Sequence, residues 1–575
     1  MENKTHHLKI VFTSDIHGNY FPYDFRHERW GKGSLQRVYG YVSFLRKRYA
    51  DKMILIDGGD IIQGEPTSYY FNYIDKSEGH KVADICNYIG YDACVIGNHD
   101  IETGHDNFDR FVSNCHFPVL AANAIHQPTG KPYFRPYTII ERNELRIALI
   151  GFITPAIPHW IPKNVWRDLL FLDIKESASY WVEKVRREES PDLVVGVIHS
   201  GLENGIVTPS YKENAVKETA SEVPGFDLIL YGHDHASNME DVYCVDGGSV
   251  LCVNPGSYAY SVALVDIKVT KGAGREILHK DISCQLIYIG SLHNQYTHQF
   301  RKQFEKEFNN ILHFSSEKLG VMTEKVDVKD AYFGSSAYID LIHTLQHHVS
   351  GAQLSFAAPL FFNASIESGD LKINNLFNLY RFEDRLYTLR LTGKEIKDYL
   401  EMSYSTWICQ MHSADDPFLL TEPMKNNPSR IGFKNFLFNF DCASGILYEV
   451  DVRKGTGERV HIISMSDGKP FSLTDNYTVA MTAYRANGGG ELLTKGAGLT
   501  KDDIERRTVR TTEKDIRYYL MEYIKEKHVI TPTARHTWRF IPEDWVAAAT
   551  IRERELLFGQ ANSPYSSSEN DKRDR

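Results

Sequence analysis

The chain has 575 residues, with 75 acidic and 65 basic side chains and a formal net charge of −10. This length is well beyond the size at which a single hydrophobic core stops growing, so we expect two or more domains. The acidic balance argues against a general nucleic-acid binder, but it leaves a nucleotide substrate open because bound metal ions can supply positive charge locally.

No apolar stretch approaches the length of a membrane span, so we expect no membrane partner. The first residues, MENKTHHLKIVF, show no signal-peptide pattern before the first strand. This pattern predicts a cytoplasmic protein, unless a leader has been removed. The eight cysteines include no C-x-x-C pair, which favours buried thiols over a disulfide framework.

From residue 8 to about residue 287, strand patterns alternate with helical ones. The segments 137–153 and 249–269 look like antiparallel hairpins. The pattern predicts an α/β fold with a mixed sheet, or two stacked sheets with helices outside. The predicted strands are 8–14, 53–57, 93–97, 117–122, 137–140, 145–153, 192–199, 226–232, 249–253 and 258–269.

Residues 292–320 are polar and helix-favouring, with a phenylalanine stripe, which predicts a helical linker over 292–325 between domains 1–291 and 326–559. The second domain mixes helical and strand patterns. Residues 560–575 are too poor in apolar side chains to order, so we predict a disordered tail. The second domain's helical patterns lie near 335–349, 393–404 and 512–526, and its strand patterns at 386–391, 446–452 and 477–483.

Several apolar, β-branched runs of the first domain end in side chains that bind metals. Because such runs predict neighbouring strands, their polar ends should gather at one edge of the sheet, where α/β proteins bind ligands. The endings are SDIHG (14–18), GGD (58–60), GNHD (97–100), HSG (199–201) and GHDH (232–235).

This set of ligands predicts a site for two divalent cations. Asp60 is our choice for the carboxylate that bridges them. Mixed imidazole and carboxylate ligation favours Mn, Zn, Fe or Co, and the sequence does not choose among them. One ion would be held by Asp15, His17 and His235, and the other by Asn98, His199 and His233.

The order and wording of these motifs over residues 8–290 resemble the calcineurin-like metallophosphoesterase superfamily. The resemblance implies a four-layer αββα sandwich, and it matches the seven residues above to the family's metal ligands. It also matches His99 to the catalytic histidine and places Glu102 where a residue orients that histidine. For Asp100 we prefer the interpretation of a helix N-cap.

The C-terminal half resembles the α+β substrate-binding domain of bacterial 5′-nucleotidases and 2′,3′-cyclic-nucleotide phosphodiesterases, on the segments 355–361, 379–403, 438–452 and 484–492. In that family two aromatic rings sandwich the nucleobase, and the matching positions are Phe438 and Tyr484. Phe438 is equally well explained as a core residue. Tyr484 is favoured as a stacking residue because the glycines at 488–490, Gly488 and Gly489 among them, allow backbone to approach a ligand.

We therefore expect a dimetal phosphoesterase of nucleotides, in which a metal-bridging hydroxide attacks phosphorus and His99 assists the leaving group. Residues 360–366 read LFFNASI where 5′-nucleotidases carry a glycine-rich segment with an arginine. This difference favours a 2′,3′-cyclic-nucleotide phosphodiesterase/3′-nucleotidase. The alternatives are a 5′-nucleotidase or UDP-sugar hydrolase, a protein phosphatase or DNA-repair nuclease on the same core, and a non-enzymatic binding protein. The oligomeric state stays open.

Overall fold

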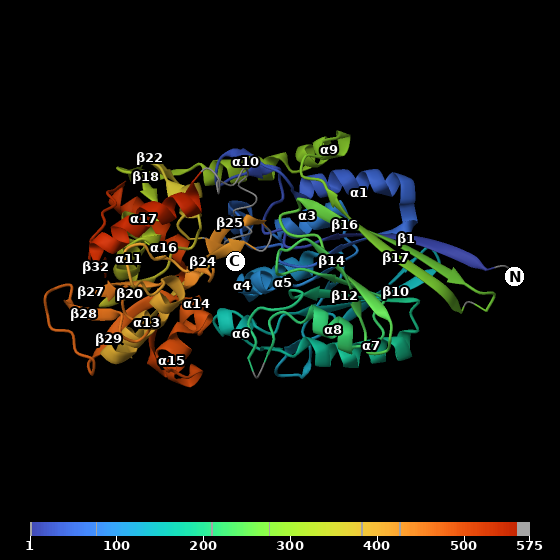
Figure 1. Ribbon diagram of the computed structural model, residues 1–575. Helices are drawn as coiled ribbons and strands as arrows, with labels where there is room; N and C mark the ends of the chain where they lie inside the picture. Colours follow the sequence, from blue (N-terminus) through green and yellow to red (C-terminus); the bar gives the residue numbers. More distant parts are fainter. Residues whose placement is uncertain are drawn as a thin grey trace. The chain divides into compact units, whose positions relative to one another are not determined.

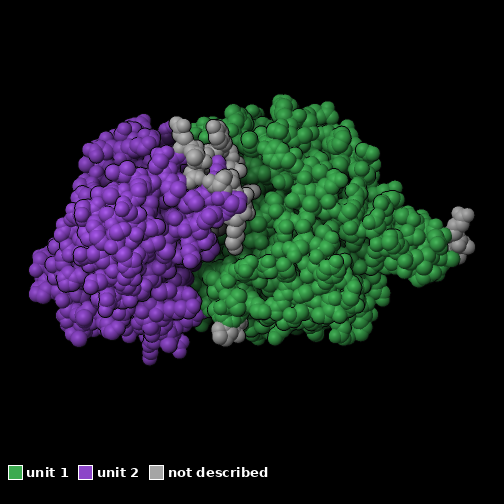
Figure 2. Space-filling model, viewed as in Figure 1, with its two compact units in different colours: residues 1–315 green, residues 316–575 purple. Residues whose placement is uncertain are grey.

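The structure is a computed structural model that describes residues 3–75, 77–208, 211–274, 276–380, 383–424 and 427–559. The chain forms two compact units, residues 1–315 and 316–575 (Figure 2). The boundary falls inside the segment 292–325 that was predicted to be a linker. The predicted tail, 560–575, lies outside the described residues.

The first unit is built on two six-stranded sheets (Figure 1). The first sheet has the order β17 (Ile277–Tyr288), β16 (Ser261–Lys271), β1 (Lys4–Thr13), β4 (Met53–Asp57), β5 (Ala93–Val95) and β6 (Val119–Leu120). The second has the order β14 (Asn238–Tyr243), β15 (Ser249–Asn254), β13 (Leu228–Tyr231), β12 (Leu193–His199), β10 (Leu145–Ile153) and β9 (Tyr137–Arg142).

Side-chain alternation along these strands creates the layers. In β1, Ile10 and Phe12 belong to the apolar cluster between the sheets, whereas Val11 belongs to the cluster beneath the helices of the first sheet. Successive side chains of a strand point to opposite faces of the sheet, so one strand contributes to two cores. A third cluster lies under the helices of the second sheet. The predicted four-layer αββα sandwich is confirmed.

Helices supply the outer layers. The first sheet is covered by α1 (Leu35–Tyr49), α3 (Lys81–Ile89), α5 (His105–Asn114), α9 (Gln295–Gln303) and α10 (Glu305–Ser315), and the second by α7 (Ile174–Glu189) and α8 (Val216–Glu222). The phenylalanine stripe of α9 and α10 is buried in the core of the first unit. Short helices α2 (Pro66–Tyr69), α4 (Asn98–Glu102) and α6 (Ile157–Trp160) follow strands.

The predicted hairpin over 249–269 is wrong. Strand β15 pairs with β13 and β14 in the second sheet, whereas β16 pairs with β1 and β17 in the first. The partner strands β14 and β17 lie at sheet edges and carry many exposed polar side chains, so their hydrophobic signal is weak. The other predicted hairpin, β9 with β10, is confirmed.

The second unit mixes strands and helices, as the predicted α+β class requires. Its largest sheet has the order β26 (Cys442–Ser444), β20 (Leu354–Ala357), β29 (Asn476–Thr482), β23 (Arg385–Thr392) and β30 (Thr508–Asp515). Smaller sheets are β28 (Val460–Met465), β27 (Ile446–Asp451) and β32 (Trp538–Ile541); β22 (Gly369–Lys372), β18 (Lys318–Met322) and β31 (Val529–Ile530); and the pairs β19 (Val326–Asp327) with β21 (Ser365–Ile366) and β24 (Thr421–Met424) with β25 (Asn427–Phe433).

Three described helices of this unit, α11 (Ala337–Ser350), α13 (Gly393–Trp407) and α16 (Ile516–Lys527), lie at predicted positions, whereas the other four were not predicted. Helix α13 begins at a capping box in which Thr392 accepts from the Glu395 amide and Glu395 from the Thr392 amide. Among the described helices of the chain, none is long and apolar enough to cross a membrane. The helices are α11 (Ala337–Ser350), α12 (Ile373–Leu376), α13 (Gly393–Trp407), α14 (Ala483–Ala486), α15 (Lys501–Arg507), α16 (Ile516–Lys527) and α17 (Glu543–Phe558).

Candidate dimetal active site

The predicted metal ligands of the first unit come together in space. They follow or end the parallel strands β1, β4, β5, β12 and β13, whose carboxyl ends share one edge of the sandwich. Two groups of ligand atoms form there, each with its atoms within 4.8 Å of one another. The groups are Asp15, His17 and His235, called here the first metal position, and Asp60, His199 and His233, called the second.

The first metal position is almost closed to solvent. His235 Nε2 lies 2.8 Å from His17 Nε2 and 3.2 Å from Asp15 Oδ1. The three residues are exposed by 4% or less. The lone pairs of imidazole nitrogens and a carboxylate oxygen converge on one point, which is the arrangement that a divalent cation stabilises.

The second metal position includes the predicted amide ligand. His199 Nε2 lies 3.1 Å from both Asp60 Oδ2 and Asn98 Oδ1. His233 completes the group, with its side chain 11% exposed. All seven predicted ligands are therefore brought into the two adjoining groups.

Asp60 lies between the two positions. Its Oδ2 atom is buried and accepts no hydrogen bond, although it lies 3.1 Å from His199 Nε2 and 3.8 Å from His17 Nε2. A buried carboxylate oxygen without a donor is costly unless a cation compensates it. Its other oxygen, Oδ1, accepts the His99 amide at 2.8 Å. These contacts fit a carboxylate that bridges two metal ions.

Two of the histidines are oriented by backbone carbonyls. His199 Nδ1 lies 2.7 Å from the Gly58 carbonyl oxygen, and His17 Nδ1 lies 3.2 Å from that of Gln63. In each ring Nδ1 donates, so the Nε2 lone pair faces the metal position. Burial alone would raise the pKa of Asp60, but without metal the positive charge of protonated His199, His99 and His17 holds it well below its usual range.

The backbone is strained at this site. Positive φ angles occur at five ligands, a conformation that is uncommon outside glycine and costs about 1–3 kcal/mol per residue. Such turns aim side chains of adjacent residues at one point. The angles are 52° at Asp15, 48° at His17, 57° at Asp60, 82° at His233 and 52° at His235.

His99 and Glu102 form a pair beside the metal positions. Glu102 Oε2 lies 2.6 Å from His99 Nδ1, one turn away on α4. The His99 ring meets the His17 ring edge to face at 5.4 Å. Because Nδ1 is held by the carboxylate, Nε2 is the ring nitrogen that can act on a substrate. The longer side chain of Glu102 therefore reaches His99 directly.

Asp100 has a different role from the helix N-cap that the sequence suggested. The cap of α4 is Gly97, and Asp100 lies three residues later. Its carboxylate accepts the amides of Gly97 and of three successive residues that begin with Asp60, all within 2.9 Å. Asp100 thus fixes the turn that carries the bridging carboxylate. Sequence spacing could not reveal contacts made across two strands.

Glu213 was not identified from the sequence. Its Oε1 atom lies 3.0 Å from His233 Nε2. Glu213 lies in the connection between β12 and α8, twenty residues from His233, and no motif spacing relates the two. A lone glutamate in a connecting segment gives no signal of this contact.

The two aromatic residues predicted to bind the base lie together in the second unit. Phe438 and Tyr484 are half-buried, and their rings meet edge to face, with centroids 5.7 Å apart and an 89° interplanar angle. A base between two parallel rings needs about 7 Å, since each carbon contact takes about 3.5 Å. One ring must therefore turn for a base to enter between them.

The glycines after Tyr484 support its ring directly. A Cβ atom at Gly489 would lie 2.5 Å from the Tyr484 ring, and Gly488 has a φ of 95°. Arg485 is fully used within the protein: its guanidinium donates to Asp441, Asn439 and the carbonyls of Phe438 and Gly489. Arg485 therefore joins the two ring-bearing segments and cannot also anchor a phosphate.

Comparisons with known proteins agree with this geometry. Residues 8–237 match the calcineurin-like phosphoesterase family, and residues 315–495 match the 5′-nucleotidase C-terminal domain family. The chain therefore combines a calcineurin-like phosphoesterase domain with a 5′-nucleotidase C-terminal domain. Members of this family hydrolyse phosphoric esters with divalent metal ions, and the two metal positions fit that chemistry.

Two sequence relatives cover nearly all of this metallophosphoesterase. It is 27% identical over 593 residues to the trifunctional nucleotide phosphoesterase protein YfkN of Bacillus subtilis, covering 93% of this chain and 39% of YfkN. It is 25% identical over 596 residues to the 2′,3′-cyclic-nucleotide 2′-phosphodiesterase/3′-nucleotidase of Yersinia enterocolitica, covering 92% of this chain and 88% of that one. The chain thus spans less than half of YfkN and most of the Yersinia protein.

A solved structure supports the fold. The 5′-nucleotidase precursor of Thermus thermophilus superposes with a TM-score of 0.63 at 20% identity, covering 93% of this chain and 100% of that one. At this level of identity the similarity concerns the fold alone.

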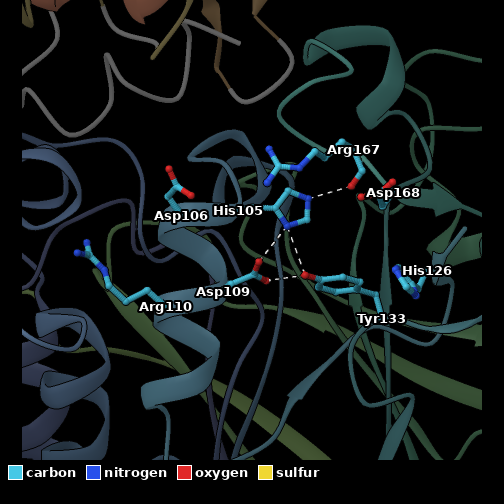
Figure 3. Close-up of a pocket in the computed structure, with 8 residues that line it drawn as sticks. All are labelled: His105, Asp106, Asp109, Arg110, His126, Tyr133, Arg167 and Asp168. Atoms are coloured by element: carbon cyan, nitrogen blue, oxygen red, sulfur yellow. Dashed lines mark hydrogen bonds and ion pairs between the residues drawn. The ribbon is translucent and has the colours of Figure 1, made fainter. Parts of the chain in front are cut away.

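A separate polar pocket of about 510 Å³ lies elsewhere on the phosphoesterase unit (Figure 3). Four of its eight lining residues bind one another: His105 Nδ1 lies 2.9 Å from Asp109, Tyr133 donates to Asp109, and His105 Nε2 lies 2.9 Å from the Arg167 carbonyl. None of its lining residues is a predicted ligand or catalytic residue. These contacts fasten the start of α5 to its neighbours.

Proposed function

We propose that this metallophosphoesterase hydrolyses nucleotide phosphoesters and prefers 2′,3′-cyclic nucleotides and 3′-nucleotides over 5′-nucleotides. The observation that carries the proposal is the pairing of a dimetal site in one unit with two half-buried aromatic rings in the other. The extent of the match to the Yersinia phosphodiesterase/3′-nucleotidase supports the same substrate class.

The segment at 360–366 supports the choice of phosphate position. Phe361 and Phe362 are buried, and the Phe362 ring packs against Phe433 and Phe558. The segment contains no cationic side chain, and three of its seven residues, Phe361, Phe362 and Ile366, are buried. A charge-assisted hydrogen bond is typically worth about 1.5–3 kcal/mol, so a 5′-phosphate would lose that much where an arginine is missing.

The catalytic roles follow from the contacts. Two bound divalent ions would neutralise phosphoryl charge and activate a water molecule. His99, oriented by Glu102, stands next to His17 and delivers a proton to the leaving ribose oxygen through Nε2. Asp60 keeps the two positions together, and Asp100 holds the Asp60 turn in place.

Base recognition belongs to the second unit. Phe438 stacks on Phe436 at 5.1 Å with an angle of 9°, and Phe436 is 52% exposed. Stacking on an aromatic face is worth about 1–3 kcal/mol per base and tolerates any base. This supports an enzyme with broad base preference.

The test is a substrate panel. We expect Mn²⁺-loaded enzyme to hydrolyse 2′,3′-cyclic AMP and 3′-AMP with higher kcat/KM than 5′-AMP or a UDP-sugar, and chelator to abolish all four activities. A clear preference for 5′-AMP or for the UDP-sugar would refute the proposed specificity. If the metal-loaded protein hydrolysed none of these substrates, the result would favour the non-enzymatic alternative.

A 5′-nucleotidase is the second candidate because of Arg385. This half-buried arginine begins β23, and its side chain forms no hydrogen bond or ion pair in the described part of the chain. Arg381, the other candidate near it, lies outside the described residues. If 5′-AMP is the best substrate, Arg385→Ala should lower its kcat/KM selectively, with the values for 2′,3′-cyclic AMP unchanged.

A further inference from the structure

We propose that Glu213 is a positioning residue that sets the affinity of the second metal position through His233. This inference rests on the dimetal centre of the proposed function and not on the identity of the nucleotide. Glu213 is neither one of the predicted ligands nor part of the pair formed by His99 and Glu102.

The contact fixes which nitrogen of His233 faces the metal. Glu213 Oε1 lies 3.0 Å from His233 Nε2, so a neutral imidazole donates from Nε2 and keeps its lone pair on Nδ1. His233 groups with Asp60 and His199 within metal-ligating distance. A carboxylate on the far nitrogen also makes a histidine a stronger metal ligand.

Glu213 is itself held firmly. Its second carboxylate oxygen accepts the Ile206 amide at 2.8 Å, and its own amide donates to the Ile206 carbonyl at 2.9 Å. Its carbonyl oxygen accepts from Ser200 Oγ at 2.7 Å and from Thr154 Oγ1 at 3.0 Å. These contacts preset the position of the carboxylate before a metal binds.

The same residue reaches two ligands of one position. Ser200 directly follows His199, so the Glu213 carbonyl helps to hold the segment that carries one ligand while the carboxylate orients the other. The Trp160 ring stacks on the His233 ring at 5.7 Å and 21°, which restricts the ring plane. In the first position, by contrast, His17 is oriented by the Gln63 backbone carbonyl.

This difference predicts unequal dependence on a side chain. Removing the Glu213 carboxylate should weaken the binding of the ion at the second metal position and leave binding at the first position unchanged. Loss of such an outer carboxylate typically costs about 10–100-fold in metal affinity.

The test uses the full-length protein, stripped with chelator and titrated with Mn²⁺ alone in equilibrium dialysis with elemental analysis. The variants are Glu213→Ala and the near-isosteric Glu213→Gln, whose amide oxygen can still accept from His233. Glu218→Gln is the matched control, because Glu218 pairs with Lys175 and Lys212 and contacts no ligand. Asp60→Asn, which removes charge from the bridge, is the control for weakening both positions.

We expect wild type and Glu218→Gln to bind two equivalents tightly. In Glu213→Ala the affinity for one Mn²⁺ equivalent should fall about 10–100-fold, while the other equivalent keeps its wild-type affinity. Glu213→Gln should lie in between. Thermal unfolding of the metal-free proteins, expected to coincide, checks that the variants fold.

The proposal would be overturned if both Glu213 variants bound two Mn²⁺ ions with unchanged affinity. It would also be overturned if the two metal positions lost affinity equally. A wild-type protein that binds fewer than two ions would overturn it together with the dimetal centre. A wild type that binds two ions but hydrolyses no nucleotide would refute the proposed function alone, because the role of Glu213 is measured by metal binding.

Discussion

Single side chains at the candidate active site divide into those placed to hold metal and one placed to act on a substrate. Five of the seven candidate ligands lie in strained turns, and Asp60 Oδ2 is left without a hydrogen-bond donor between the two groups. His99 lies beside them, but Glu102 engages its Nδ1 atom. Metal binding and proton transfer are thus assigned to different residues, so they should respond differently to substitution.

His99→Ala should retain both metal ions while kcat for 2′,3′-cyclic AMP falls by about 10²–10⁴-fold, the usual contribution of a general acid. Glu102→Gln should reduce kcat less, because the ring stays in place but its orientation weakens. Elemental analysis and steady-state kinetics measure the two effects. Loss of metal from His99→Ala would instead make His99 a ligand or a structural support.

The sequence singled out the seven candidate ligands because each one follows or ends a buried, β-branched strand in a recognisable order. It could not identify Glu213 or Asp100 as supports, since their contacts depend on how connections of irregular backbone close over the sheet edge. It also could not orient Phe438 and Tyr484, because a stacking residue and a core residue share the same sequence signal. Tertiary contacts between segments that are distant in the sequence could not be predicted.

Among the secondary-structure elements, the buried strands β4, β10 and β12 were predicted to within a residue, whereas the edge strands β14 and β17 and the buried strand β20 of the second unit were missed. Buried strands are continuous apolar runs, but an edge strand facing solvent alternates weakly. The missed edge strands changed the pairing of β15 and β16, although not the layer order. Elements thus follow from local sequence more securely than their partners do.

Helix α3 carries a pH-dependent cap. Buried His80 accepts the Val82 amide at Nδ1, and its Nε2 lies 3.1 Å from Asn72 Oδ1, so the ring must be neutral. Burial, with the nearby charge of Arg110, lowers the pKa of His80 from 6.5 to about 3. Because His80 takes up a proton more readily in the unfolded chain, neutral His80 stabilises the folded unit above pH 6.5. This stabilisation is lost as the pH falls from 6.5 toward 3.

Between pH 7.5 and pH 5 this one residue should cost the first unit about 2 kcal/mol of unfolding free energy. His80→Asn keeps a capping oxygen but cannot be protonated. Between pH 7.5 and pH 5 this variant should therefore lose about 2 kcal/mol less unfolding free energy than the wild type. Urea unfolding at the two pH values measures it. His116→Asn, at an exposed histidine, is the control, and an unchanged pH dependence in His80→Asn would contradict the assignment.

Gly489 tests the support of the aromatic pair. Its φ is not positive, so alanine is allowed by the backbone, and the conflict is with the Tyr484 ring 2.5 Å from the new Cβ. Gly489→Ala should displace that ring and raise KM for nucleotides, with metal content unchanged. Gly455→Ala is the control, since the nearest atom to its Cβ lies 3.8 Å away. An unchanged KM in Gly489→Ala would argue against Tyr484 as a stacking residue.

At the scale of the whole molecule, the two kinds of chemistry lie in separate compact units. Residues 1–315 contain the metal positions and three apolar clusters of their own, including the buried faces of α9 and α10. Residues 316–575 contain Phe438, Tyr484 and the arginine that joins their segments. We therefore expect the first unit to fold and bind metal by itself.

A protein shortened to residues 1–315 should bind two Mn²⁺ ions and hydrolyse bis-p-nitrophenyl phosphate, which has no nucleobase. Its KM for 2′,3′-cyclic AMP should rise by a factor of roughly 5–150, the equivalent of one lost stacking contact of about 1–3 kcal/mol. Full-length Tyr484→Ala should show a rise in the same direction with the second unit still present, which separates loss of the ring from loss of the unit. Unchanged nucleotide KM in the shortened protein would show that the base is recognised by the first unit. Loss of metal from it would show that the metal positions depend on residues beyond 315.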